Sequence, residues 1–304
     1  MKPFDFSCKH HILLQDEDGA LRPMDEPYFQ AEQIASGTWK ILSDGDYSYL
    51  LEGDEEALVI DSGYGAGDIR AFCQTLTSRP VRCIANTHDH FDHTANNGRF
   101  ELAYMSAETQ PLATIPFPSF AGIFFPRDYP VRIVDHGDVI PLKGRELLVL
   151  KMPDHAVGSI AFLDRRERML FSGDELMVHG GKDLNGTVEQ WLCYMERLAR
   201  YRGDFDTICA GGGLGSAEQV DAQLAITRRI LDGFEGEYRE PAPFPNFAAT
   251  AEDGRAIWRR RLPHPGDGPD NWNAGKEYRR SVDYGKYSIT YDIRRVRSSE
   301  EVSI

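Results

Sequence analysis

The chain has 304 residues, a hydrophobic fraction of 41% and a formal net charge of −14 at pH 7. This length suits one large domain or two ordinary ones, and the composition predicts a packed core rather than disorder. The acidic balance argues against nucleic acid as a partner, because phosphate binding needs a concentrated positive face. No run of about 18 apolar residues occurs, so neither a membrane-spanning helix nor a membrane partner is expected.

The N-terminal stretch has no continuous apolar segment before its charges, which predicts that no secretory signal is present. The cysteines are odd in number, widely spaced and without a C-x-x-C pair, which favours a reducing, cytoplasmic compartment with mostly buried thiols. These cysteines are Cys8, Cys73, Cys83, Cys193 and Cys209.

The first predicted elements are strands. Residues 38–61 contain three β-rich segments divided by the turn sequences "SDGD" and "GDEE". A helix is predicted over 67–77, and residues 81–87 follow as a short buried strand. The apolar face of the helix consists of Ile69, Phe72, Cys73 and Leu76.

Residues 114–130, "TIPFPSFAGIFFPRDYP", fit neither the helix nor the strand period. Their five aromatic side chains and four prolines predict an ordered loop. Two interpretations stay open for it: a packed surface loop, or an apolar lid that excludes water and grips the substrate. The aromatic residues are Phe117, Phe120, Phe124, Phe125 and Tyr129.

Residues 146–152 are predicted as a strand, and 159–174 as a hairpin that ends at Asp174. A capping box of Thr187 with Gln190 predicts the start of one helix, and a box of Ser216 with Gln219 predicts the next. Between these helices, residues 205–213 read as a strand running into glycines.

The composition changes from about residue 236. We therefore divide the chain into a catalytic domain over 1–235, whose first ~35 residues are a lead-in segment, and a C-terminal extension over 236–304. The extension ends in "YSITYDIRRV", a predicted strand. Its many aromatic side chains predict that it packs on the domain or on a partner subunit.

The sequence "THDHFDH" follows the buried strand at 81–87 and contains His88, Asp89, His90, Asp92 and His93. Among imidazoles and carboxylates so close together, groups of like charge would repel one another, and all of them would lose hydration free energy in a core. A divalent cation removes both costs, since it binds deprotonated donors. The cluster therefore predicts a metal site with nitrogen and oxygen ligands.

Two further candidate ligands follow later strands: His155 follows one and Asp174 follows another. Loops at the carboxyl ends of strands converge in α/β folds, so these residues are expected near the cluster. A nitrogen and oxygen donor set suits Zn²⁺ first, with Fe, Mn, Ni or Co as alternatives.

These motifs resemble those of the metallo-β-lactamase superfamily. "THDHFDH" is similar to its H-x-H-x-D-H signature, "PDHAVGSI" to its P-x-H-x-x-G-S element, "LFSGD" to its G-D element and "ALVIDSGYG" to its D-x-G turn. The order and spacing agree over residues 38–232. The resemblance implies an α/β (α+β) fold, a four-layer αβ/βα sandwich with metals at one edge.

The resemblance implies a binuclear ligand set. His88, His90 and His155 would bind the first metal, Asp92 and His93 the second, and Asp174 would bridge them. Asp89 is expected to accept a hydrogen bond from a metal-bound imidazole.

One family ligand is missing. The family's G-H-G element reads "AGGGLG" here, and Gly212 stands where its histidine belongs. The second ion is therefore expected to bind more weakly. His179 is a possible substitute ligand or a substrate contact.

The resulting hypothesis is a metal-dependent hydrolase that uses metal-activated hydroxide on an ester, lactone, thioester or phosphoester small molecule, with Asp92 orienting the nucleophile or accepting a proton. Two alternatives stay open: a non-hydrolytic redox or lyase enzyme on the same fold, or a binding protein whose second metal site has decayed. A homodimer is possible.

Overall fold

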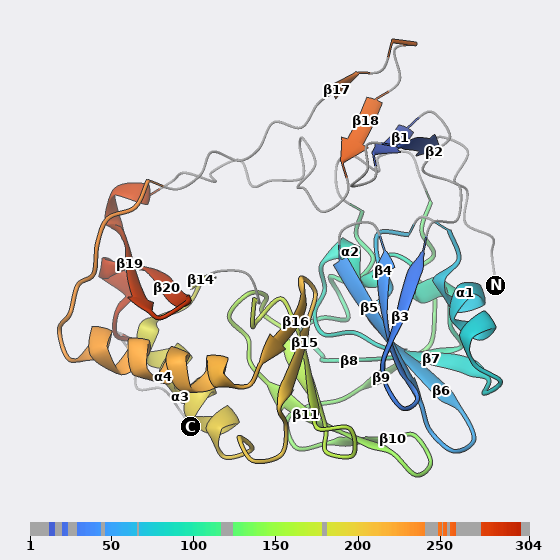
Figure 1. The fold of residues 1–304 in the computed structure, drawn as a ribbon, viewed down its shortest axis with the longest axis horizontal. Coiled ribbons are helices and arrows are strands. Elements are labelled where there is room, and N and C mark those ends of the chain that lie inside the picture. Colours follow the sequence, from blue (N-terminus) through green and yellow to red (C-terminus); the bar gives the residue numbers. More distant parts are fainter. Residues whose placement is uncertain are drawn as a thin grey trace. The chain divides into compact units, whose positions relative to one another are not determined.

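The computed structural model describes residues 12–15, 20–23, 29–43, 46–65, 67–116, 124–177, 181–240, 249–250, 252–253, 256–259 and 275–298. The chain divides into two compact units (Figure 1). Unit 1 comprises residues 1–134, 141–145 and 242–272, and unit 2 comprises residues 135–140, 146–241 and 273–304. Among the described residues, no helix is long and apolar enough to cross a bilayer.

Unit 1 is built on a seven-stranded sheet with the order β3-β4-β5-β6-β7-β8-β9. Strands β3 to β6 pair antiparallel and β6 to β9 pair parallel. The predicted strands at 38–61 and 81–87 are confirmed. The bounds are β3 Gln30–Ala35, β4 Thr38–Ser43, β5 Asp46–Glu52, β6 Ala57–Ile60, β7 Val81–Ala85, β8 Leu102–Met105 and β9 Val131–Ile133.

The predicted helix on this sheet is α1, Ile69–Leu76. Asp68 caps it by accepting a hydrogen bond from the backbone N–H of Ala71 at 3.0 Å. Ile69 and Cys73 are buried in the core of unit 1, against which Phe72 and Leu76 pack, so the predicted apolar face is confirmed. Two short helices follow β7: α2, Phe91–Thr94, and η2, Asn97–Arg99.

Unit 1 also contains a four-stranded sheet that the sequence did not predict, in the order β17-β18-β1-β2. It pairs segments far apart in the chain, since β1 lies parallel to β18. The bounds are β1 Ile12–Gln15, β2 Leu21–Pro23, β17 Ala249–Thr250 and β18 Ala256–Arg259.

Unit 2 is built on a six-stranded sheet with the order β10-β11-β12-β13-β15-β16. The β11, β12 and β13 strands pair antiparallel in turn, and β15 pairs parallel with β13. Strands β11, β13 and β15 therefore run in one direction, and their carboxyl ends share an edge. The bounds are β10 Val139–Pro141, β11 Glu146–Lys151, β12 Ile160–Asp164, β13 Met169–Gly173, β15 Thr207–Ala210 and β16 Gly213–Ser216.

Helices α3, Val188–Ala199, and α4, Glu218–Leu231, contribute to the core of unit 2. The predicted capping box of Thr187 with Gln190 is confirmed at α3. The box predicted for Ser216 with Gln219 is wrong. Residue 217, already in helical conformation, is the N-cap of α4, and the buried Gln219 side chain donates instead to the backbone carbonyl of Met177 at 2.8 Å.

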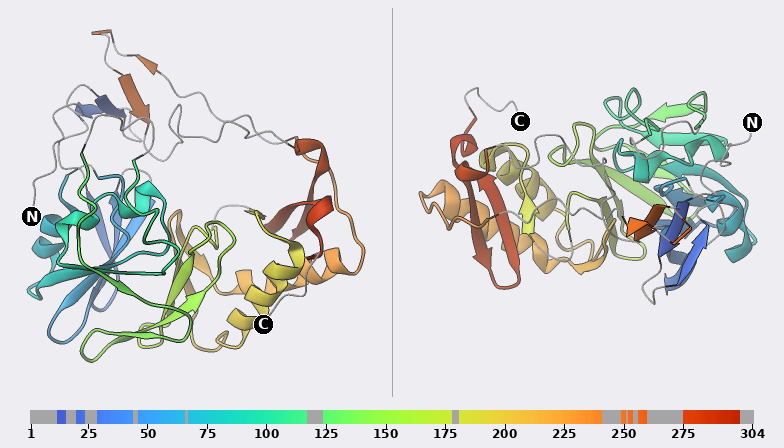
Figure 2. Two further views of the ribbon diagram at one scale, coloured as in Figure 1. Left: turned by 180° about the vertical axis from the view of Figure 1, so that it is seen from behind. Right: turned by 90° about the horizontal axis from the view of Figure 1, so that it is seen from above.

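Part of the predicted C-terminal extension completes unit 2. A three-stranded sheet, β14-β20-β19, lies alongside α4 in both Figure 1 and Figure 2. Its Val282, Ile289 and Tyr291 are buried in the same core as α3 and α4. The strand predicted at the end of the extension is confirmed, while the boundary at residue 236 stays a prediction. The bounds are β14 Gly181–Asp183, β19 Arg279–Tyr284 and β20 Tyr287–Asp292, with the short helices η4 Lys276–Tyr278 and η5 Ile293–Arg295.

A buried ion cluster lies in unit 2. The Lys182 ammonium lies 2.8 Å from a carboxylate oxygen of Asp154 and 2.8 Å from one of Glu175, and all three side chains are almost fully buried. Burial raises the pKa of Glu175 despite the opposing effect of Lys182. Burial alone would lower the pKa of Lys182, but attraction to Glu175 and Asp154 outweighs it, so the net pKa is raised. The two shifts thus have different causes: burial dominates at Glu175, and the two neighbouring carboxylates dominate at Lys182.

We predict that Ile289→Ala lowers the free energy of unfolding by about 2–5 kcal/mol, because it leaves a cavity where β20 packs on α4. Tyr284→Ala, in the same hairpin, is the matched control. Its side chain is 57% exposed, so we expect a change within about 0.5 kcal/mol. Urea unfolding measures both. Equal stability of Ile289→Ala and the parent would show that the hairpin does not contribute to the core.

We predict that Lys182→Met lowers the free energy of unfolding by about 3–5 kcal/mol, because two buried carboxylates lose their cation. Glu175→Gln should cost less, since it leaves one buried cation paired with one carboxylate and keeps a side-chain oxygen acceptor. Equilibrium unfolding in urea at neutral pH compares the two. A loss in Glu175→Gln as large as that in Lys182→Met would contradict this account.

Candidate metal centre

The ligand-type residues of unit 1 lie at the carboxyl ends of its parallel strands. Asp61 follows β6, and His88 follows β7 (Figure 1). The two loops are joined by a hydrogen bond from the Asp61 N–H to the Ala85 carbonyl at 3.0 Å. Parallel pairing of β6 with β7 therefore brings residues 26 or more positions apart to one edge of the sheet.

Asp61 is a buried carboxylate, only 3% exposed, at the centre of a hydrogen-bond network. It accepts hydrogen bonds from the Thr87 N–H at 2.8 Å and from the Thr87 hydroxyl at 2.7 Å. Its Oδ2 also lies 2.9 Å from Nδ1 of His93. An ionised carboxylate can only accept, so His93 must carry a proton on Nδ1.

The same network orients His88. Because the Thr87 hydroxyl donates its proton to Asp61, its oxygen is left to accept from Nδ1–H of His88 at 3.0 Å. Both His88 and His93 therefore present the lone pair of Nε2, the form in which imidazole binds metals.

Hydrogen bonds also fix the backbone of His93. Its carbonyl accepts hydrogen bonds from the Ser62 N–H at 2.8 Å, the Ser62 hydroxyl at 3.1 Å and the Asn86 side-chain amide at 2.9 Å. Helix α2 therefore lies against the turn that carries Asp61, and these hydrogen bonds restrict movement of the His93 ring.

The donor atoms of unit 1 lie at spacings that fit metal binding. The ring centroid of His88 is 4.6 Å from that of His90 and 4.2 Å from that of His93. Nε2 of His93 is 3.6 Å from a carboxylate oxygen of Asp92. Oδ1 of Asp92 is buried and has no hydrogen-bond partner among the described residues, which is costly unless a cation takes the place of a donor. The residues present therefore fit a divalent cation.

Asp89 is not the hydrogen-bond partner found at Nδ1 of His88 or of His93. Its Oδ1 is also buried without a hydrogen-bond partner in the described part of the chain. Asp61 and Thr87 bond the imidazoles instead. Sequence reasoning missed Asp61 as the orienting carboxylate, although the D-S-G turn sequence that contains it was noticed.

The ligand-type residues of unit 2 gather in the same way at one edge of its sheet. His155 follows β11, Asp174 follows β13 and Gly212 follows β15. Nε2 of His155 lies 3.7 Å from a carboxylate oxygen of Asp174. The glycine occupies a turn between β15 and β16, and it offers no side-chain donor there.

The ion cluster of unit 2 fixes the loop that carries His155. Oε1 of Glu175 accepts hydrogen bonds from the backbone N–H of Asp154 at 3.0 Å and of His155 at 2.6 Å. The Asp154 carboxylate in turn accepts from the N–H of Gly186 at 2.8 Å. Lys182 therefore pairs with two carboxylates that accept hydrogen bonds from the backbone of Asp154, His155 and Gly186. His179 lies outside the described residues.

The aromatic loop is only partly described, since Phe117 and Phe120 fall outside the described residues. Phe125 is buried with its ring centroid 4.7 Å from that of Phe91 in α2. The Tyr129 hydroxyl lies 2.9 Å from the Thr114 hydroxyl and 3.1 Å from the Asn97 amide. These two side chains support the α2 segment by packing, whereas Phe124 is exposed.

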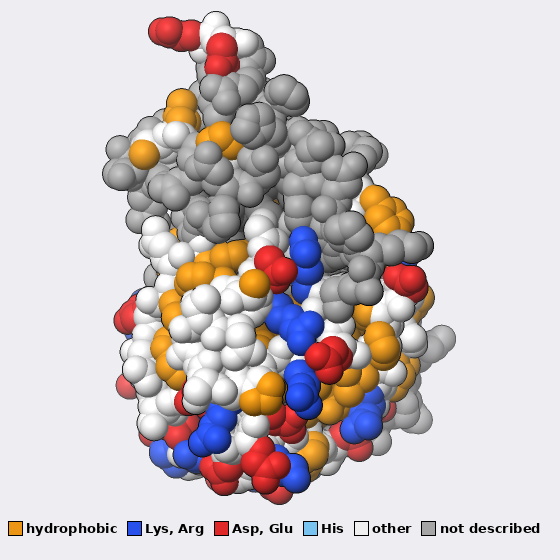
Figure 3. All heavy atoms as spheres, turned by 90° about the vertical axis from the view of Figure 1, so that its right-hand side faces the viewer, with side chains coloured by type: hydrophobic (Ala, Val, Ile, Leu, Met, Phe, Trp, Pro, Cys, Tyr) orange, Lys and Arg blue, Asp and Glu red, His pale blue; other side chains and the backbone are white. Residues whose placement is uncertain are grey.

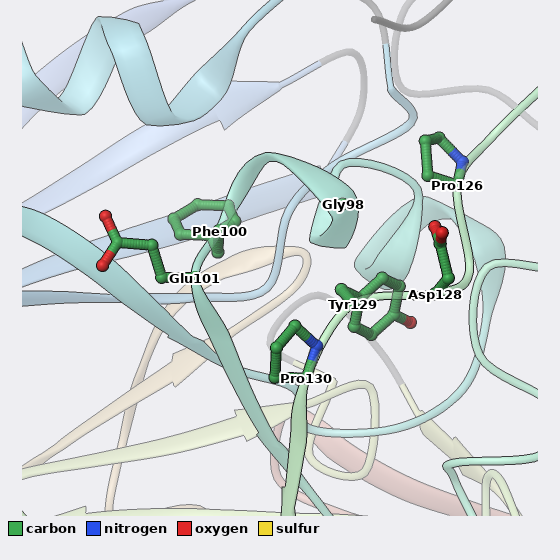
Figure 4. A pocket seen from close by; sticks show the side chains of 7 residues that line it. All are labelled: Gly98, Phe100, Glu101, Pro126, Asp128, Tyr129 and Pro130. Carbon is green, nitrogen blue, oxygen red and sulfur yellow. The ribbon is translucent and has the colours of Figure 1, made fainter. Parts of the chain in front are cut away.

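A pocket of about 560 Å³ lies beside Tyr129 (Figure 4). Its described lining contains none of the histidines of the motif, so we do not assign it to the metal centre. The lining residues are Gly98, Phe100, Glu101, Pro126, Asp128, Tyr129 and Pro130.

Charge on the described surface is mixed in the view of Figure 3. Lys and Arg side chains lie among Asp and Glu side chains on that face, without a continuous basic patch. The predictions about nucleic acid and membrane partners stay predictions.

Comparison with known proteins identifies relatives that are named as hydrolases. The chain is 31% identical over 175 residues to acyl-coenzyme A thioesterase MBLAC2 of Gallus gallus, covering 48% of this chain and 60% of that protein. It is 28% identical to the Homo sapiens protein of that name, over 57% of this chain and 70% of that one. It is 33% identical to the hydroxyacylglutathione hydrolase of Pseudomonas savastanoi pv. phaseolicola, over 54% of this chain and 61% of that protein.

Solved structures share the fold at low sequence identity. A metallo-beta-lactamase from Pontibacter korlensis is 17% identical with a TM-score of 0.52, covering 66% of this chain and 99% of that one. Rubredoxin oxygen:oxidoreductase from Desulfovibrio gigas has the same identity and TM-score, over 66% of this chain and 62% of that one. The expected α/β metallo-β-lactamase-like fold is confirmed. A profile of the metallo-beta-lactamase superfamily matches residues 44–211, more than half of the chain, and the chain belongs to that superfamily.

Proposed function

We propose that the chain is a metal-dependent hydrolase that cleaves thioesters of small thiol carriers. This proposal rests on the hydrogen-bond network of the buried Asp61 carboxylate. The network leaves the Nε2 lone pair of both His88 and His93 available to bind a metal. Hydrogen bonds that fix the tautomer and orientation of ligand imidazoles in this way are typical of metal centres.

The proposed ligand set has two parts. His88, His90 and His155 would hold the first ion, Asp92 and His93 would hold the second, and Asp174 would be shared by both. The superfamily membership and the gathering of donors at one sheet edge within each unit support this assignment. Nitrogen and oxygen donors without a thiolate favour Zn²⁺, with Fe, Mn, Ni or Co as alternatives.

When bound, such an ion lowers the pKa of a water molecule towards about 7 and polarises the substrate carbonyl. The protein contributes orientation and proton acceptance. Asp92 has two carboxylate oxygens, so one could contact the ion while the other orients the attacking water or accepts its proton. Asp61 and Glu175 keep the ligands in place, through the imidazoles in unit 1 and through the backbone of His155 in unit 2.

The thioester substrate class is supported by the names of the relatives, since acyl-coenzyme A and hydroxyacylglutathione both join an acyl group to a thiol. A thiol with a pKa near 8.5 leaves readily as a thiolate. Such a leaving group needs no strong proton donor, which suits a site whose side chains are metal ligands and proton acceptors. Ester, lactone and phosphoester substrates are the comparison classes.

We predict that His90→Ala and His155→Ala each lose bound metal and lose most hydrolysis of acyl-coenzyme A and S-acylglutathione substrates. His136→Ala is the matched control, because this histidine lies in a turn of unit 2 outside the proposed ligand set. Elemental analysis and a thiol-release assay measure metal and turnover. Full metal retention in both ligand variants would refute the assignment. An iron-loaded parent without hydrolytic turnover would instead favour the oxidoreductase alternative.

We predict that Asp61→Asn weakens metal affinity by about 10–100-fold, because an amide N–H₂ would face either the Thr87 N–H or both the Thr87 hydroxyl and the Nδ1–H of His93. Asp89→Asn removes the same charge from the neighbouring segment but no described ring contact, so its affinity should stay close to that of the parent. Competition with a chromophoric chelator measures both. A larger loss in Asp89→Asn than in Asp61→Asn would reverse the two roles.

A further inference from the structure

The second metal site of the proposed enzyme has one protein ligand fewer than the family pattern, because Gly212 replaces a histidine. The inference below rests on the proposed function and concerns this site. The described part of unit 1 contains a carboxylate that neither the motif nor the family pattern includes: Asp46, the first residue of β5.

Sheet pairing and close packing bring Asp46 to the metal edge of unit 1. It pairs with Ser43, the last residue of β4, at the end of the hairpin where β4 leads into β5. Ser43 packs directly against Gly63 in the turn that carries Asp61. Gly63 has a φ of 67°, and a Cβ there would lie 1.9 Å from the Ser43 hydroxyl, so only glycine permits this approach. Strand β5 also contacts α2, which carries Asp92 and His93 (Figure 1).

The distances fit a shared ion. One ligand atom each from Asp46, Asp92 and His93 lie within 4.8 Å of one another. Two ligands with bonds of about 2.0–2.2 Å to one zinc ion can be at most about 4.4 Å apart. A small side-chain rotation therefore closes the set around an ion. The ring of His93 is already fixed by Asp61, so the half-buried Asp46 is the member that would move.

We propose that Asp46 is a protein ligand of the second metal ion, together with Asp92 and His93. It supplies a donor from the β4–β5 hairpin. This donor takes the place of the family histidine that Gly212 replaces. Two carboxylates within 4.8 Å repel each other, and a divalent cation between them converts that repulsion into attraction.

The substitution changes the chemistry of the site. An anionic oxygen donor replaces a neutral imidazole, so the second site becomes richer in oxygen than the family pattern. Oxygen donors favour harder ions such as Mn²⁺ over ions that prefer nitrogen. The second site should therefore hold Mn²⁺ better, relative to Zn²⁺, than a site completed by histidine.

The test is metal content per chain after dialysis of the full-length protein against graded chelator, after loading with Zn²⁺ or with Mn²⁺. The variants are Asp46→Asn, which keeps the shape of the side chain, His179→Ala, and the charge control Asp89→Asn. We expect the parent to retain two ions and Asp46→Asn to lose one of them at a chelator concentration at least about 10-fold lower. His179→Ala and Asp89→Asn should follow the parent.

The visible spectrum of the Co²⁺-loaded protein provides a second readout, because it reports the ligands of each ion. A changed spectrum of the second ion in Asp46→Asn, with that of the first ion preserved, would support the proposal. Two ions held equally well by the parent and Asp46→Asn would overturn it and leave the proposed hydrolase intact. Loss of the second ion in His179→Ala alone would assign the role to His179. A parent that binds no ion and cleaves no thioester would overturn both proposals.

Discussion

The candidate metal centre of unit 1 depends on one buried carboxylate. Removing Asp61 from water costs several kcal/mol unless hydrogen bonds replace the lost hydration. Here it accepts from a backbone N–H, a hydroxyl and an imidazole, and hydrogen bonds to a charged acceptor are stronger than neutral ones. The proton positions on two histidines follow from this single charge. The backbone of Asp61 has a φ of 58°, a conformation that aspartate tolerates better than most residues.

In unit 2 a different interaction fixes the loop that carries His155. There the central charge is a cation, Lys182, whose ammonium also lies 4.6 Å from the ring centroid of Trp191 in α3. Two carboxylates surround it, and each accepts hydrogen bonds from the backbone near His155 or near the start of α3. The buried charges therefore act on the loop backbone, whereas in unit 1 they act on the ligand rings.

Gly212 departs from the family pattern, which has a histidine at this position. The turn between β15 and β16 offers no donor, while the hairpin end in unit 1 presents an extra carboxylate beside Asp92 and His93. In the proposed arrangement, Asp46 adds a carboxylate to the Asp92 and His93 pair of unit 1. The oxygen-rich second site would then be a property of this chain rather than of the superfamily, and it offers a physical reason for a different metal preference.

Much of the fold and of the candidate site was predictable from the sequence. The histidines and carboxylates of residues 88–93 stand together behind an apolar strand, and the apolar faces of α1 and α3 repeat with the period of a helix. Such patterns are local, so the local sequence determines them. The second capping box failed because the start of α4 is set by the end of β16 and by the burial of Gln219.

The sequence by itself determined which residues could bind a metal and roughly where each strand would deliver them. Only the tertiary structure decided how they are held. Asp61 meets His93 across 32 positions, Asp46 meets α2 through the β4–β5 hairpin, and β14 pairs with β20 from the far end of the chain. No local pattern contains these contacts, because a hydrogen-bond partner in a sheet depends on which strands become neighbours, and that is settled only when the whole core packs.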